Sequence, residues 1–261
     1  MGTFQFKKFS VVNERSAMKV NTDGVLLGAV MDIRPDDRSL LDIGTGTGTI
    51  ALMAAQRLAA SIEDRPISNN AQDIAKESLH GNYQISAIDI DEPSATEASQ
   101  NFAQSPWAAN LKAYNLSLEQ YEKTLVEEAH FDIIFSNPPY FEDSLTAPDQ
   151  RKSTARHTSD GLSYRDIFDF AAERLSVDGR VAFVLPADQE LALCRYARMT
   201  GLHLFRITRV RTVPRKAPSR IIAEFSRYRK ENPEDTTLTI QNEGTYTQEY
   251  LNVMKEFYLF A

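Results

Sequence analysis

Residues 39–60, SLLDIGTGTGTIALMAAQRLAA, decide the fold, because a glycine-rich turn joins two segments of different periodicity there. SLLDI is short, apolar and ends in an acid, as a buried strand does, and the residues after the turn are apolar at helical spacing. Gly44, Gly46 and Gly48 occupy alternate positions between them. Glycines allow close backbone approach, and a helix N-terminus favours negative charge. This order of elements predicts a nucleotide-like cofactor beside the turn.

The glycine spacing and two acids distinguish between cofactors. Dinucleotide sites favour G-x-G-x-x-G, whereas this chain has G-x-G-x-G directly after Asp42. That acid would repel a pyrophosphate but suits the ammonium group of a methionine moiety. Asp89 ends the next apolar run, where an acid accepts hydrogen bonds from ribose hydroxyls. The sequence predicts S-adenosylmethionine rather than NAD, and the expected turn contacts are Asp42, Gly44, Thr45, Gly46 and Gly48.

Residues after the next two strands extend the expected cofactor site. Ile90 directly follows Asp89. Asn115 and Leu116 stand where such folds contact the adenine ring, although Asn115 would serve equally well as a helix cap. Asp91 could bind the ribose in place of Asp89, but we interpret it as the N-cap of the following helix.

Strands and helices alternate along most of the chain. Strands are expected at 39–43, 85–90, 111–115, 131–136 and 179–186, and helices at 49–60, 92–103, 116–129, 163–175 and 188–200. Two long strands, 203–213 and 219–229, then follow without a helix and predict a hairpin with one antiparallel edge strand. We expect an α/β, Rossmann-like fold with a seven-stranded, mostly parallel sheet, an antiparallel last strand and helices on both faces.

Residues 1–261 are expected to form one domain with four special parts. Residues 61–82 are polar, rich in Asn and Ser, and stand where a short connection is expected, so we interpret them as a surface insertion. The other parts are an N-terminal segment, a basic terminal hairpin, and a terminal strand and helix (1–36, 202–230 and 236–261).

The composition is that of an ordinary globular protein, with 42% hydrophobic and 25% charged residues. No apolar stretch reaches the length of a membrane span, and the start of the chain lacks the features of a signal peptide. Cys194 is the only cysteine, which excludes a disulfide framework and a thiolate metal cluster. We expect a cytoplasmic protein without a metal and without a membrane partner, as a monomer or weak oligomer.

Basic residues concentrate in 206–230, which hold nine Arg or Lys and one acid, Glu224, whereas the whole chain has a formal charge of −7. A basic block on an acidic body is typical of phosphate contact in nucleic-acid binding. A solvated strand face explains the block equally well.

The stretch SNPPYF (136–141) follows the apolar run FDIIF. Each proline fixes its own φ, and Pro138 also moves Asn137 away from the helical region. A buried strand therefore leads into a rigid turn that presents one amide and one aromatic ring. An ordinary tight loop is the alternative interpretation.

Together, DIGTGTG (42–48), AIDID (87–91) and SNPPY (136–140) resemble the class I methyltransferases that modify exocyclic or amide nitrogens. Four further stretches narrow the resemblance to the bacterial tRNA1(Val) (adenine(37)-N6)-methyltransferase family. They are MKVNTDGVLLGAV (18–30), SPW (105–107), ARHT (155–158) and FYL (257–259). The resemblance covers essentially the whole chain apart from the insertion. Asn21 departs from the family pattern, because a glycine is expected at this position. Asparagine tolerates left-handed backbone better than most residues.

The resemblance implies S-adenosylmethionine-dependent N6-methylation of an adenine in tRNA. The side-chain oxygen of Asn137 and the carbonyl of Pro138 would each accept one N6 hydrogen, in a turn stiffened by Pro139. Asn137 is also expected to contact the cofactor. Tyr140 would stack on the extruded base. The same chemistry on a protein glutamine or an rRNA guanine amine stays open, because a planar amide offers the same two hydrogens. A binding module without catalysis and an NAD-dependent oxidoreductase are disfavoured by the intact turn and by the glycine spacing.

Further site residues come from the N-terminal block, the loop after SNPPYF and the hairpin. Lys19, Thr22 and Asp23 are expected to line the cofactor or base pocket, and either Thr22 or Asp23 would also serve as a helix cap. The expected RNA contacts are Arg156, His157, Arg211, Arg215, Lys216 and Arg220, although His157 could equally be an exposed loop residue. Cys194, Trp107 and the aromatic residues of EFYLF (256–260) are interpreted as packing residues.

Overall fold

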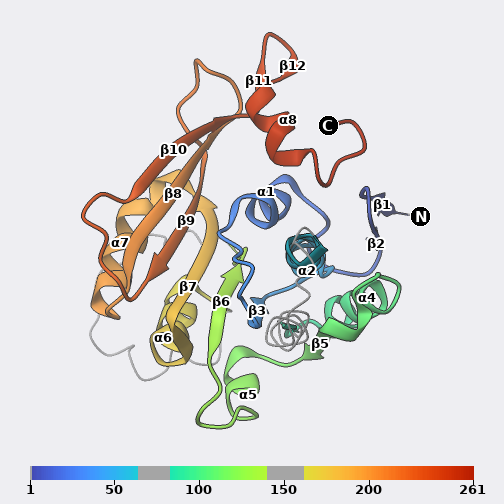
Figure 1. Cartoon of the computed structure of the whole chain (residues 1–261), viewed down its shortest axis with the longest axis vertical. Helices are drawn as coiled ribbons and strands as arrows, with labels where there is room; N and C mark the ends of the chain where they lie inside the picture. Colours follow the sequence, from blue (N-terminus) through green and yellow to red (C-terminus); the bar gives the residue numbers. More distant parts are fainter. Residues whose placement is uncertain (1, 64–82, 140–161) are drawn as a thin grey trace, which may run out of the picture.

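The computed structural model describes residues 2–63, 83–139 and 162–261. Its main feature is a sheet to which the described residues contribute eight strands (Figure 1). In their order across the sheet, these are β10 (Glu234–Thr239), β8 (His203–Arg211), β9 (Arg220–Ser226), β7 (Leu175–Pro186), β6 (Phe131–Ser136), β3 (Ser39–Ile43), β4 (Gln84–Asp89) and β5 (Leu111–Asn115). The Rossmann-like α/β class is confirmed.

The order reverses beside β3. The chain first builds outward from β3 through β4 to β5 and then continues on the other side of β3 with β6 and β7, and all these neighbours are parallel. The carboxyl ends of β3 and β6 therefore flank a topological switch point, where open α/β sheets bind their ligands.

The hairpin differs from the expectation in one respect. β9 is antiparallel to both β7 and β8, so the antiparallel strand lies inside the sheet. The edge is β10, which pairs in parallel with β8 over six residues. The expected count of seven strands was therefore wrong by one, because EDTTLT carries a single large apolar residue, Leu238, and gives a weak strand pattern.

Helices cover both faces of the sheet, and each face has its own hydrophobic cluster. Neighbouring residues of β3 show this division, since Leu40 belongs to one cluster and Leu41 to the other. The larger helices are α1 (Thr22–Val30), α2 (Thr49–Glu63), α4 (Glu92–Ala103), α6 (Tyr164–Arg174) and α7 (Glu190–Met199). Within the described ranges, no helix is both long and apolar enough to cross a membrane.

Two shorter helices complete the layers. α5 (Leu118–Glu122) is much shorter than the helix expected at 116–129, because Tyr121 is its only buried residue and Val126 beyond it is exposed. α8 (Gln248–Met254) packs against β10 and α1.

The N-terminal segment contacts the C-terminal segment, which ends near α8 (Figure 1). A hairpin of β1 (Thr3–Gln5) and β2 (Ser10–Val12) lies at the N-terminus, and a second small hairpin, β11 (Gln241–Asn242) with β12 (Thr245–Tyr246), precedes α8. The Nζ atom of Lys7 donates to the carbonyls of Lys255 and Ala261, at 2.6 and 2.8 Å.

The packing residues were partly as expected. Trp107 and Phe257 are buried, as predicted, and Cys194 is half-buried on α7. Phe260 is 56% exposed, so the prediction that the whole EFYLF segment packs into the core was wrong there. The proposed insertion, 61–82, begins inside α2, and its part from residue 64 onward lies outside the described residues.

Candidate active site

Two turns lie side by side at the switch point. β3 pairs with β6 so that Ile43 stands opposite Ser136, and the Ser136 hydroxyl donates to the Ile43 carbonyl at 2.7 Å. The glycine turn follows Ile43 directly, and Asn137 follows Ser136. The two sequence motifs are thus neighbours in space.

The glycine turn requires residues without a side chain. Gly44, Gly46 and Gly48 all have left-handed backbone, with φ of 72°, 56° and 79°. The backbone N–H groups of Gly44 and Thr45 donate to the Ile88 carbonyl at 2.9 and 3.0 Å, which ties the turn to the end of β4. A Cβ atom on Gly48 would lie 2.5 Å from the Phe102 ring on α4.

Gly48→Ala is expected to lower the free energy of unfolding by about 3 kcal/mol. Left-handed backbone costs an L-residue roughly 1–2 kcal/mol, and overpacking adds a similar amount. Gly201→Ala is the matched control, because Gly201 has φ 78° but nothing within 4 Å of an added Cβ. Urea denaturation measures both, and equal losses would show that the Phe102 contact is unimportant.

Asp42 is fully buried beneath the turn and accepts a hydrogen bond from the Thr45 hydroxyl at 2.7 Å. Its Oδ1 atom has no hydrogen bond of normal geometry within the described residues. Burial raises the pKa of Asp42 to about 7, against the lowering effect of the Thr45 bond, and the charge of Asp89 raises it further. A buried carboxylate with an unsatisfied oxygen suits a site for a cationic group.

Asp89 lies at the end of β4 and faces the glycine turn. Its Oδ2 atom accepts from the Gly46 backbone N–H at 2.8 Å, and its Oδ1 atom from that of Asp91 at 2.9 Å. Burial raises its pKa although both bonds lower it. Ile90, which follows it, is 77% exposed. The exposed Ile90 side chain thus adjoins the Asp89 carboxylate, which suits the flat base and the ribose hydroxyls of an adenosine group.

Asn115 organises the segment after β4. Its amide donates to the carbonyls of Asp89 and Ile90, at 3.1 and 3.0 Å. The alternative of a helix cap was wrong, because Ser117 caps α5. Asp91 caps α4 through the Ser94 backbone N–H, which confirms the preferred interpretation of that residue.

Asn137 leaves β6 with only 7% of its surface exposed. Pro138 is buried beside it, and Pro139 is exposed. The Nδ2 atom of Asn137 lies 3.6 Å from the sulfur of Met18, a partner that the sequence did not suggest. Tyr140, Arg156 and His157 lie outside the described residues.

The N-terminal block contains the three residues that were expected to line the cofactor or base pocket. Lys19 is exposed and donates to the Glu14 carbonyl at 2.7 Å, and Thr22 is exposed at the start of α1. Asp23 accepts from Arg220 at 2.7 Å. Met18 instead contacts Asn137, and its carbonyl would lie 3.5 Å from a Cβ atom on Gly46. A lone methionine gives no chemical signal in a sequence.

Asn21 caps α1. Its side chain accepts from the Gly24 backbone N–H at 2.9 Å, and its φ of −137° is extended. The expected left-handed backbone at this position was therefore wrong, and so was the expectation that Thr22 or Asp23 is the cap.

Acidic side chains neutralise part of the basic block. Three of its arginines pair with acids, Arg206 with Glu224 and Glu234, Arg209 with Glu190 and Asp235, and Arg220 with Asp23. Arg211 donates to the Thr239 hydroxyl at 2.8 Å. Arg215 and Lys216 are exposed in the loop between β8 and β9. Pro186 at the carboxyl end of β7 pairs with Arg220 at the start of β9. This loop therefore lies at the carboxyl end of the parallel strands, as the two turns do.

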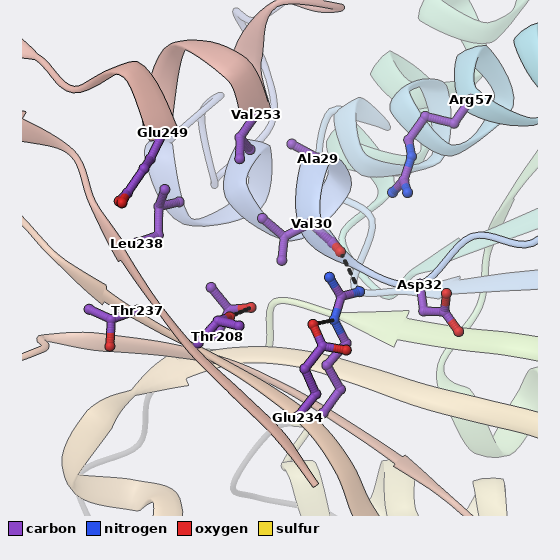
Figure 2. A pocket seen from close by; sticks show the side chains of 12 residues that line it. Ala29, Val30, Asp32, Arg57, Thr208, Glu234, Thr237, Leu238, Glu249 and Val253 are labelled. Carbon is purple, nitrogen blue, oxygen red and sulfur yellow. Dashed lines mark hydrogen bonds and ion pairs between the residues drawn. The ribbon is translucent and has the colours of Figure 1, made fainter.

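A cavity of about 520 Å³ lies elsewhere, between α1, α8 and strands β8 and β10 (Figure 2). Its two arginines are engaged. Arg57 donates to the carbonyls of Gly28 and Met31, and Arg206 to that of Val30. Burial lowers the pKa of Arg57 to about 10. The cavity is lined by none of the candidate site residues.

Comparison with known proteins defines the class of protein. Residues 30–212 match the family model for an RMKL-like methyltransferase domain. The fold is similar to that of a predicted O-methyltransferase from Agrobacterium tumefaciens (TM-score 0.57, 16% identity, 90% of this chain and 96% of that one). It is also similar to the 16S rRNA N2 G1207 methyltransferase of T. thermophilus (TM-score 0.51, 18% identity, 84% and 47%). The chain has the fold of the class I Rossmann-like methyltransferases.

Closer relatives define the family. The chain is 39% identical to the tRNA1(Val) (adenine(37)-N6)-methyltransferase of Parabacteroides distasonis, over 98% of this chain and 97% of that one. It is 36% identical to the enzyme of the same name from Trichodesmium erythraeum, with the same coverage. The chain belongs to the tRNA1(Val) (adenine(37)-N6)-methyltransferase family.

Proposed function

We propose that this protein transfers a methyl group from S-adenosylmethionine to the N6 atom of adenine-37 in tRNA1(Val). The observation that carries the proposal is the pairing of Ile43 with Ser136, which sets the Asn137 turn beside the glycine turn. The names of the relatives indicate the substrate, and the two adjacent turns provide a place where cofactor and adenine can meet.

The residues around the glycine turn fit the cofactor. Asp42 would face its ammonium group, Asp89 would accept hydrogen bonds from its ribose, and Ile90 would pack on its adenine. The turn residues, Asn115 and Leu116 would complete the site. When bound, the cofactor supplies an electrophilic methyl group on a sulfonium. Lys19, Thr22 and Asp23 would contribute to the rim of the site, where Arg220 of the hairpin pairs with Asp23.

Asn137 and Pro138 would hold the reacting amine. An adenine N6 amine is a poor nucleophile because its lone pair is delocalised into the ring. If the Asn137 side-chain oxygen and the Pro138 carbonyl each accept one N6 hydrogen, the nitrogen is held toward tetrahedral geometry with its lone pair directed at the methyl group. Both acceptors are held rigidly by β6 and the prolines, so the benefit comes from positioning and fixed dipoles.

Cofactor affinity is expected to rise with pH around neutrality. Since the pKa of Asp42 is raised to about 7, this carboxyl is mostly protonated at pH 6 and mostly ionised at pH 8. Only the ionised form attracts an ammonium group, so the Kd of S-adenosylhomocysteine should fall by about tenfold between those values. Calorimetric titration of the wild type and Asp42→Asn tests this. The same pH dependence in the variant would exclude Asp42 as its source.

We propose that RNA binds at the carboxyl end of the parallel strands, where both turns lie. Arg215 and Lys216 are exposed there, and we propose that they bind phosphates with support from Arg211 and Arg220. Arg156 and His157 follow the catalytic turn in the sequence and are proposed as further contacts.

A substrate comparison tests the function. An unmodified tRNA1(Val) transcript, the same transcript with guanine at position 37, an rRNA fragment and a release-factor protein are each incubated with enzyme and labelled S-adenosylmethionine. Label in the first transcript alone is the expected result. Label in the protein or the rRNA alone would support the rival amine or amide substrates and overturn the proposal.

A further inference from the structure

We propose that Glu97 is a positioning residue for methyl transfer, because it holds residues 14–16 against α4 and thereby keeps Met18 in contact with Asn137. This rests on the proposed function, which assigns the reacting amine to Asn137. Met18 begins the stretch 18–30 that carries the family resemblance, but nothing in the sequence assigned it a role, and Glu97 lies in none of the motifs.

Glu97 is a buried carboxylate that accepts hydrogen bonds from three backbone N–H groups of the N-terminal segment. Only 1% of the surface of Glu97 is exposed. Oε1 accepts from Glu14 at 2.7 Å and Arg15 at 2.8 Å, and Oε2 accepts from Ser16 at 2.9 Å. Burial alone would raise the pKa of Glu97, but the three donors and the charge of Lys19 together outweigh it and the pKa is lowered. The carboxylate is therefore ionised at neutral pH, and its bonds are charge-assisted.

Two neighbours on the same face of α4 extend this attachment. Ser94, Glu97 and Asn101 recur at helical spacing and are all buried. Ser94 bonds the Ser16 hydroxyl at 3.0 Å. The Asn101 amide donates to the carbonyls of Val12 and Thr47, at 3.0 and 2.9 Å, and its oxygen accepts from the Val12 N–H. α4 thus ties the N-terminal segment to the glycine turn.

The attachment continues from Ser16 to the catalytic amide. The Ser16 hydroxyl donates to the Met18 carbonyl at 2.9 Å, and the Met18 sulfur lies 3.6 Å from Asn137 Nδ2. Met18 keeps 41% of its surface exposed beside this amide. Release of residues 14–16 would therefore remove a contact that orients Asn137.

Limited proteolysis tests the attachment without requiring activity. Arg15 and Lys19 are exposed trypsin sites on the held segment. Glu97→Gln keeps the side-chain volume but loses the charge, and cleavage at these two sites should become about tenfold faster, the effect of weakening a hydrogen bond to a charged group. Glu92→Gln, at an exposed residue in the first turn of α4, is the matched control and should cleave like the wild type. Unchanged cleavage in Glu97→Gln would overturn the proposal.

Kinetics test whether Glu97 acts through Met18. Glu97→Gln and Met18→Ala should each lower kcat by about tenfold, and the double variant should be no slower than the slower single variant, because both remove the same orientation of Asn137. Losses that multiply, or wild-type kcat in Glu97→Gln, would overturn the proposal. If the wild type methylates no tRNA, the proposed function fails, and the cleavage rates still decide whether Glu97 holds the segment.

Discussion

Asn137→Ala is expected to lower kcat for methyl transfer to tRNA by about 10²–10³-fold, the scale of losing one fixed polar contact to a reacting group. The variant keeps the glycine turn, Asp42 and Asp89, so most of the affinity for S-adenosylhomocysteine should remain. A single-turnover assay with saturating tRNA measures the chemical step, and calorimetry measures the affinity.

Asn242→Ala serves as the control, because Asn242 is an exposed residue of β11 far along the chain from both turns. It should match the wild type in both assays. Full activity of Asn137→Ala would show that its amide does not hold the reacting amine. A parallel loss of cofactor affinity would show that the side chain acts on the cofactor instead.

Arg180→Leu is expected to lower the free energy of unfolding by about 3–5 kcal/mol, because it leaves the Asp37 carboxylate buried without its cation. Arg180 is 1% exposed on β7 and donates to both oxygens of Asp37, with Nη1 at 2.9 Å from Oδ1. It also donates to the backbone carbonyls of Asp32 and Asp132, so it joins β6 and β7 to the segment before β3.

Arg34→Leu is the matched control for that measurement. The Arg34 side chain is 39% exposed and pairs with Asp32 at the surface, so its loss should cost less than about 1 kcal/mol. Chemical denaturation at neutral pH compares the two variants. Equal losses would contradict the importance of burial for the Arg180 pair.

Most of the sheet could be predicted from the sequence, because its central strands are buried on both faces and carry strong apolar runs. The glycine turn and Asn137 were equally visible, since few residue types can adopt their backbone or supply their chemistry. β10 was missed as a full strand because it lies at the edge, where threonines and acids replace an apolar run.

Contacts between distant segments could not be predicted in this way. The basic block of 206–230 was visible as composition, but Asp23, Glu190 and Asp235, which neutralise parts of it, come from elsewhere in the chain. Asn21 looked like a substitute for glycine, whereas its side chain caps α1. The contacts of Met18 and Glu97, on which their proposed roles rest, depend on the path of the N-terminal segment over α4.

Nucleoside analysis of a tRNA1(Val) transcript, methylated in vitro by the purified protein and S-adenosylmethionine, tests the central claim most directly. The account predicts one N6-methyladenosine per transcript, located at position 37 and absent when Asn137→Ala is used. A transcript that stays unmethylated while a protein or rRNA substrate gains the methyl group would contradict it.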